Sequence, residues 1–140
     1  MADRNVRIVN KNGKNPVMSY FPKAASTAFD KNSLVEFGSG TLNPADDNDT
    51  LVLGIIQKEV ATTDTDYASA SMVGVEVIQE GDEVEIDCTA ALTRGTTYGI
   101  SNAYTVDQSD TSNKVFTCTV PVSSTRARGF FVKLYSNTTV

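Results

Sequence analysis

Apolar and polar side chains alternate along most of this chain with a period of two residues, which is typical of half-buried β-strands. In the segment 83–88, EVEIDC, three carboxylates alternate with two aliphatic residues and a cysteine. Short runs rich in Val, Ile, Phe, Tyr and Thr, separated by polar turn clusters, lie at 34–37, 51–56, 73–78, 84–88, 98–100, 104–106, 115–120 and 130–135. The pattern predicts an all-β domain, a small barrel or sandwich, with at most one short helical turn within 63–72.

The first 28 residues lack this sustained alternation. The sequence Lys-Asn-Gly-Lys at 11–14 is a turn signal that could join 6–9 to 17–20 as a hairpin. The alternative is an extended arm that becomes ordered only on a partner. We predict the arm, because both ends of the chain are basic while its body is acidic. Residues 1–28 are then an N-terminal arm and residues 29–140 a β-barrel-like domain, and a chain lacking residues 2–20 should still fold.

Charge is distributed very unevenly. Residues 1–29 carry a net charge of +4, residues 30–110 carry −13 and residues 111–140 carry +4, which together give the total of −5. An acidic body between basic ends can present its cations to an acidic partner. We therefore expect partner contacts from the cations and apolar side chains of the arm, namely Arg4, Val6, Arg7, Ile8, Lys11, Lys14, Val17 and Tyr20.

The residue types present exclude much of the catalytic repertoire. The chain has no histidine and no tryptophan, so Ser-His and Cys-His nucleophile pairs are impossible. Two cysteines and carboxylates are a poor ligand set for a transition metal. The acidic cluster Asp46–Asp49 resembles part of a calcium loop, but it lacks the distal glutamate and reads as a solvated turn. We predict no catalytic residues, no cofactor and no metal.

The two cysteines follow the strand pattern. Cys88 and Cys118 each continue an alternating apolar run, which predicts buried, reduced thiols on facing strands of one core. A disulfide between them is the alternative.

Localisation and general partner classes follow from what the sequence lacks. No apolar run approaches 18 residues, so no membrane span is expected. The first seven residues have no apolar signal-peptide core, which predicts synthesis and retention in a cytoplasm unless another route exports the protein. The acidic body carries no basic stripe interleaved with aromatic residues, so nucleic acid is not an expected partner.

The order of sequence blocks resembles that of the small decoration proteins of tailed-bacteriophage capsids, the cement or head-stabilising proteins of the lambda-decoration type. The resemblance covers roughly residues 30–135 and rests on order and texture, with no single diagnostic motif. The blocks are SLVEF at 33–37, LGII at 53–56, the polar loop 60–70, VEV at 75–77, GDEVEI at 81–86, LTRGTTYGI at 92–100 and GFFV at 129–132.

This resemblance implies a β-tulip domain that forms a homotrimer on the outer surface of a virion. Such proteins bind the capsid after it has expanded, at threefold or quasi-threefold axes, and their N-terminal arm contacts the major capsid protein. They carry no catalytic residues. The alternative is a receptor- or glycan-binding head fibre or spike domain, which would need exposed aromatic side chains such as Tyr67, Tyr98 and Tyr104. A small all-β nucleotidase is disfavoured, because the chain lacks the glycine-rich tail of those enzymes.

Overall fold

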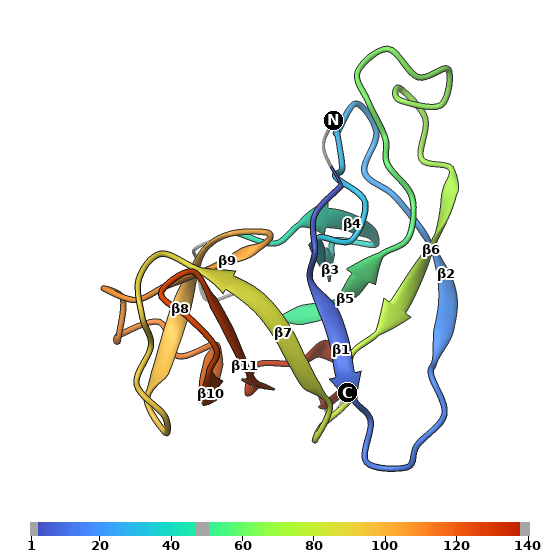
Figure 1. Cartoon of the computed structure of the whole chain (residues 1–140). Helices are drawn as coiled ribbons and strands as arrows, with labels where there is room; N and C mark the ends of the chain where they lie inside the picture. Colours follow the sequence, from blue (N-terminus) through green and yellow to red (C-terminus); the bar gives the residue numbers. More distant parts are fainter. Residues whose placement is uncertain (1–2, 47–50, 138–140) are drawn as a thin grey trace.

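The computed structural model describes residues 3–46 and 51–137, and its fold is all-β, as the alternation predicts (Figure 1). The described residues form eleven strands and one 3₁₀ turn, η1. Their bounds are β1 Arg7–Asn10, β2 Met18–Pro22, β3 Leu34–Gly38, β4 Thr41–Pro44, β5 Val52–Ile56, β6 Met72–Val77, β7 Glu83–Cys88, β8 Thr97–Asn102, β9 Thr105–Asp107, β10 Phe116–Pro121, β11 Arg126–Phe131 and η1 Tyr135–Asn137.

Five of these strands close a small barrel in the order β7-β11-β10-β8-β9. The neighbours around it are antiparallel except at the closure, where β9 runs parallel to β7 and pairs Thr105 with Asp87 and Val106 with Cys88. β1 continues the sheet beside the first half of β7, where Arg7 lies opposite Glu85. The alternation of β7 therefore turns its aliphatic side chains and Cys88 into the barrel, and its carboxylates outward.

The other five strands form a second sheet in the order β2-β6-β5-β3-β4. All of its neighbouring strands are antiparallel, and its two edges approach each other at a parallel bridge between Lys23 and Leu42. Lys23 is completely buried there, and its ammonium donates to the main-chain oxygens of Tyr67 (3.1 Å) and Ser69 (2.5 Å). This lysine therefore ties the 61–70 loop to the end of β2.

Two apolar cores meet at β3 and β5. Leu34 and Ile55 belong to the core that fills the barrel, whereas their sequence neighbours Val35 and Ile56 belong to the core of the second sheet. A strand with a core on each side has no solvent face, and this explains why β5 (VLGII) is apolar at every position. At Gly54 a Cβ atom would overlap the Glu76 carbonyl of β6, so close strand contact requires glycine there.

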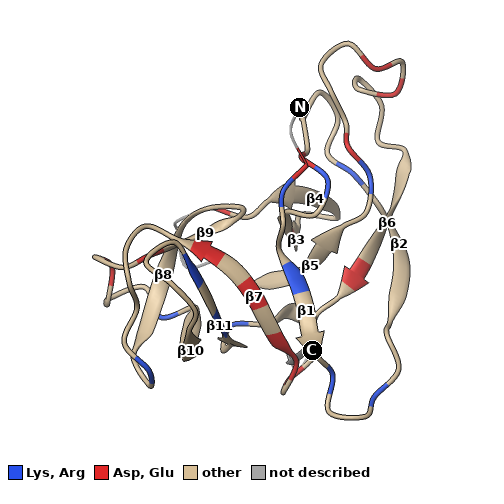
Figure 2. Cartoon of the chain, in the orientation of Figure 1, with Lys and Arg blue, Asp and Glu red and all other residues tan. Residues whose placement is uncertain are grey.

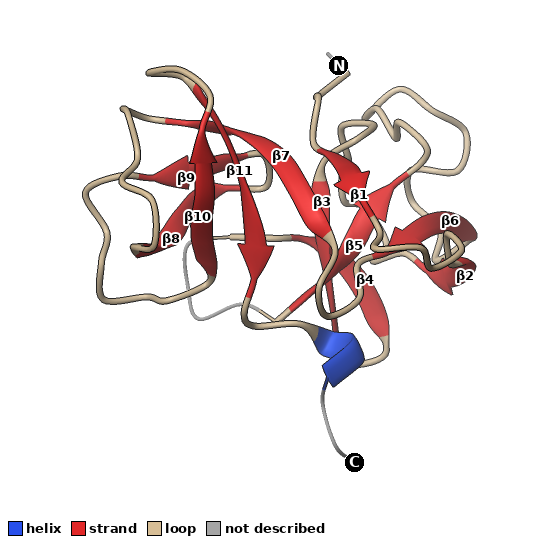
Figure 3. Ribbon diagram, turned by 60° about the horizontal axis from the view of Figure 1, so that its bottom comes forward, coloured by secondary structure: helices blue, strands red, loops and turns tan. Residues whose placement is uncertain are grey.

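Two connections cross between the sheets, and they lie against each other (Figures 1 and 3). One joins β1 to β2 through the turn at 11–14, in which Asn12 and Gly13 adopt the left-handed φ values of 54° and 81°. The other joins β6 to β7 through 79–82. The Asn12 side-chain amide donates to Gly81 O at 2.5 Å, which fastens one turn to the other.

The structure does not confirm the N-terminal arm. Residues 7–10 form β1 at the barrel and residues 18–22 form β2 of the second sheet, so the segment is built into both halves of the fold. The structure does not contain the alternative hairpin, because β1 pairs with β7 and β2 with β6, and not with each other. A turn at 11–14 is present, as its residues indicate, but it links two sheets.

Smaller differences concern element boundaries. The strand expected at 130–135 lies at Arg126–Phe131, and β4 was not expected. The segment 63–72 contains turns without a helix until β6 begins at Met72. Both cysteines are buried free thiols in the barrel core, as predicted, on β7 and β10 on either side of β11. Burial raises the pKa of each thiol above its ordinary value.

Candidate interaction surface

The basic side chains of the two chain ends converge on Glu85 of β7. This carboxylate is nearly buried and accepts from Arg7 at 3.1 Å, Arg126 at 3.1 Å and Arg128 at 2.9 Å. Arg126 also pairs with Asp87 at 2.6 Å and donates to Asn5 O. Figure 2 shows the basic band of β1 beside the acidic bands of β7. Burial alone raises the pKa of Glu85, but the hydrogen bonds from Arg128 and Arg126 outweigh it and hold that pKa below its ordinary value.

A second cluster joins the two connections that cross between the sheets. The Asp82 carboxylate is buried, lies 2.6 Å from the Lys11 ammonium and 3.2 Å from that of Lys14, and accepts from the Gln79 amide at 2.9 Å. Burial raises the pKa of Asp82, but the hydrogen bonds from Lys11, Gln79 and Lys14 outweigh that effect and lower the pKa. Lys11 and Lys14 of the predicted arm thus form ion pairs that join the two connections.

Arg4 also has internal partners. Its Nε lies 3.1 Å from an oxygen of Asp30, and its guanidinium stands 3.8 Å from the centre of the Tyr104 ring. All four cations expected to contact a partner, Arg4, Arg7, Lys11 and Lys14, are therefore paired with carboxylates of the protein itself. The structure does not gather them into an uncompensated basic patch.

The four apolar residues expected to contact a partner fall into two pairs. Val6 is 2% exposed within the barrel core and Ile8 packs against that core. Val17 and Tyr20, by contrast, are 37% and 70% exposed. Val17 and Tyr20 are thus accessible, whereas Val6 and Ile8 take part in internal packing.

Tyr20 belongs to a larger surface on β2 and β6, which we call the β2–β6 face and which also contains Met18, Pro22, Met72 and the carboxylate Glu76. In the antiparallel register Met18 lies opposite Glu76, Tyr20 opposite Gly74 and Pro22 opposite Met72, so these pairs share one side of the sheet. Met18 is 55% exposed and Met72 is 59% exposed. Exposed methionine and tyrosine side chains on a sheet are typical of a protein-binding surface.

The geometry of this face follows from its sequence. Phe21 points to the opposite side of β2, where it packs on the second core with its ring centre 5.3 Å from that of Phe37. Gly74 leaves room for the Tyr20 ring, which lies in van der Waals range of a Cβ built there. β2 is also the first strand of the sheet order, so the face continues to a sheet edge. Sequence reasoning missed Met18 and Met72, although their alternation with inward-facing residues was a usable signal.

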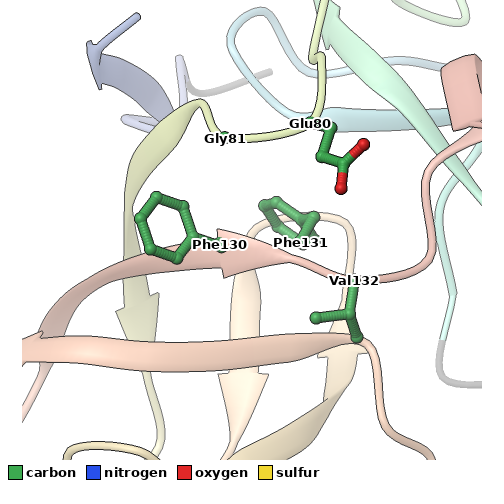
Figure 4. A pocket seen from close by; sticks show the side chains of 5 residues that line it. All are labelled: Glu80, Gly81, Phe130, Phe131 and Val132. Carbon is green, nitrogen blue, oxygen red and sulfur yellow. The ribbon is translucent and has the colours of Figure 1, made fainter. Parts of the chain in front are cut away.

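A pocket of about 390 Å³ lies where the β6–β7 connection passes the end of β11. It is lined by Glu80, Gly81, Phe130, Phe131 and Val132 (Figure 4). Its lining side chains are apolar apart from the Glu80 carboxylate, and no sequence motif indicated the pocket.

Other candidate chemistry does not assemble into a site. No group of three or more acidic or cysteine side chains that could hold a metal occurs within residues 3–46 and 51–137. Most of the Asp46–Asp49 cluster lies outside the described residues. Within the described part of the chain, no helix has the length and apolar character needed to cross a membrane.

The tyrosines considered for a glycan-binding surface pack internally. Tyr98 is buried and its hydroxyl accepts from the Thr93 amide at 2.9 Å. Tyr104 packs against the barrel core beneath Arg4, and Tyr67 packs against the second core. They form no shared exposed surface. The strongly exposed tyrosine is Tyr20.

Comparison with known proteins adds no assignment. No protein-family model matches the sequence, and no curated protein matches it at a significant level.

Proposed function

We propose that this protein is a structural virion protein that decorates and stabilises the expanded capsid of a tailed bacteriophage. It binds the outer surface of the major capsid protein, and the β2–β6 face is its docking surface. The observation that carries the proposal is the exposure of Met18, Tyr20 and Met72 on one side of a compact all-β body. The similarity of the sequence blocks to decoration proteins supplies the identity of the partner.

The charges described above modify the expected docking mode. Cations held by Glu85, Asp82 and Asp30 are already compensated and contribute little attraction to an acidic shell. Burial of methionine and tyrosine side chains supplies apolar binding free energy, and the one carboxylate that the register places among them is Glu76, opposite Met18. Docking through the face therefore replaces docking through a basic arm.

The proposed assembly is a trimer at threefold or quasi-threefold axes. Three linked copies engage several capsid subunits at once, so modest contacts add through effective concentration. A single 15.0 kDa domain would hold fewer neighbouring subunits together.

Co-sedimentation with capsids tests the proposal. Expanded and unexpanded shells of the phage that carries this gene are mixed with the purified protein and pelleted. Saturable binding to expanded shells, with little binding to unexpanded ones, is the expected result. Equal binding to both, or to neither, would contradict a decoration role.

A matched pair of variants tests the docking surface. Tyr20→Ser combined with Met72→Ser should weaken capsid binding more than tenfold, because two large apolar contacts are lost. Val122→Ser is the control, since Val122 is also strongly exposed but follows β10 of the barrel. If the control weakens binding as much as the double variant, the face is not the docking surface.

A further inference from the structure

The pocket between the β6–β7 connection and β11 combines an apolar wall with one carboxylate. Phe130 is half-buried, Phe131 is buried against Phe116 with ring centres 5.2 Å apart, and Val132 is exposed. Figure 4 shows the Glu80 carboxylate reaching from the connection toward the side of the pocket formed by Phe131 and Val132. The chain thus places a negative charge over an aromatic and aliphatic wall.

The Glu80 carboxylate has no internal partner among the described residues. No hydrogen bond or ion pair to its side chain occurs there, in contrast to the carboxylates of Asp82 and Glu85. The nearest lysine contact is to the main chain: Lys14 donates to Glu80 O at 2.7 Å, and its ammonium is paired with Asp82. The charge of Glu80 is therefore available to a ligand.

We propose that this pocket binds an arginine side chain presented by a protein partner. A guanidinium can lie against a phenylalanine ring while its N–H groups donate to a carboxylate in a two-pronged geometry. The flat, weakly hydrated guanidinium suits such a site better than a compact ammonium does. Its aliphatic stem would contact Val132, and a pocket of about 390 Å³ is large enough to admit it.

The inference does not depend on the proposed capsid role. The pocket is formed by the β6–β7 connection and β11, whereas the docking surface is on β2 and β6. It can be tested with a small probe in the absence of any capsid, so either proposal can fail while the other stands.

The experiment is an NMR titration of the full-length ¹⁵N-labelled protein with N-acetyl-arginine amide. Binding of the isolated probe in the millimolar range or weaker is expected, because one exposed ion pair and one cation–π contact are modest interactions. The amide signals of Gly81, Phe130 and Val132 should shift together along one saturation curve. N-acetyl-citrulline amide has the same shape but no charge. Its affinity should be lower than that of the arginine probe by a factor of about five.

Two variants and one control locate the interaction. Glu80→Gln should reduce affinity for the arginine probe about fivefold and narrow its preference over citrulline to the contribution of the cation–π contact. Phe130→Leu keeps an apolar wall but removes the aromatic ring. It should lower the affinity for the arginine probe more than the affinity for the citrulline probe. Glu76→Gln makes the same charge change on the second sheet and should leave the affinity unchanged.

Three results would overturn the proposal. These are the absence of shifts at the pocket, equal affinity for the arginine and citrulline probes, and equal effects of Glu80→Gln and Glu76→Gln. Dispersed spectra of each variant establish that it is folded, which is expected because the Glu80 side chain is exposed.

Discussion

β1 and β2 are adjacent in sequence and similar in length, but the fold uses them in opposite ways. β1 lies beside β7, where Arg7 is paired with Glu85 and the neighbouring Val6 is buried. β2 forms the edge of the second sheet and leaves Met18 and Tyr20 exposed. The comparison teaches that one part of a basic, weakly patterned segment can pack and form ion pairs inside the protein while the other part forms accessible surface. Under the proposed function, partner binding belongs to the accessible half.

Removal of residues 2–20 should have the largest effect. The deletion takes away β1, the first three of the five residues of β2 and the two lysines that pair with buried Asp82. We expect a loss of more than about 5 kcal/mol, which is comparable to the whole stability of a small domain. Circular dichroism should show no cooperative thermal transition. A truncated chain that melts like the full protein would instead support the prediction that the N-terminal segment is an arm outside the folded domain.

A matched pair of substitutions, at the residues that directly precede β1 and β2, separates the two halves of the segment more finely. Val6→Asp places a carboxylate in the barrel core and should cost at least about 4 kcal/mol of unfolding free energy. Val17→Asp makes the same change at a partly exposed position and should cost less than about 1 kcal/mol. Urea denaturation of both variants measures the difference. Similar midpoints would mean that the two valines do not differ in burial in solution.

Acid should weaken the ion pairs that hold the N-terminal segment to β7 and to the β6–β7 connection. Asp82 and Glu85 have a lower pKa in the folded protein than in the unfolded chain, so their stabilisation is fully present above about pH 4 to 5. It is lost as the pH falls through their folded pKa values, because the folded state must then take up protons on paired carboxylates. The melting temperature should therefore fall steeply below about pH 4.

Substitution of Asp82 tests the origin of that acid dependence. Asp82→Asn should cost about 2 kcal/mol at pH 7, and its melting curve should depend less on pH than that of the unaltered protein. Glu80→Gln is the control, since the Glu80 side chain is exposed and makes no internal ion pair. An acid profile unchanged by Asp82→Asn would show that other carboxylates control acid unfolding.

Salt should have the smallest effect. If capsid binding uses the β2–β6 face, the affinity should change less than about threefold between 50 and 500 mM NaCl, because apolar contacts are not screened. Binding through the cations of a basic arm would instead weaken steeply over the same range. Sedimentation assays at several salt concentrations distinguish the two modes, and a steep decline would contradict docking through the face.

Local pattern was sufficient for much of the fold. The alternation in EVEIDC determined that β7 is a strand with one buried side, and the same pattern placed both cysteines in the core. Such features depend on the period of the side chains along one strand, which is visible in the sequence alone. The turn at 11–14 was also local, because asparagine and glycine tolerate its left-handed backbone.

Long-range pairing decided the rest. Arg7 and Glu85 are 78 residues apart, so the basic appearance of the N-terminal segment gave no sign that its charge is compensated. The parallel pairing of β9 with β7 and the two cores on either side of β5 likewise depend on which strands meet. Tertiary structure alone made Tyr20 accessible and Val6 buried, because the exposure of an apolar side chain is set by what packs on it, and not by its own chemistry.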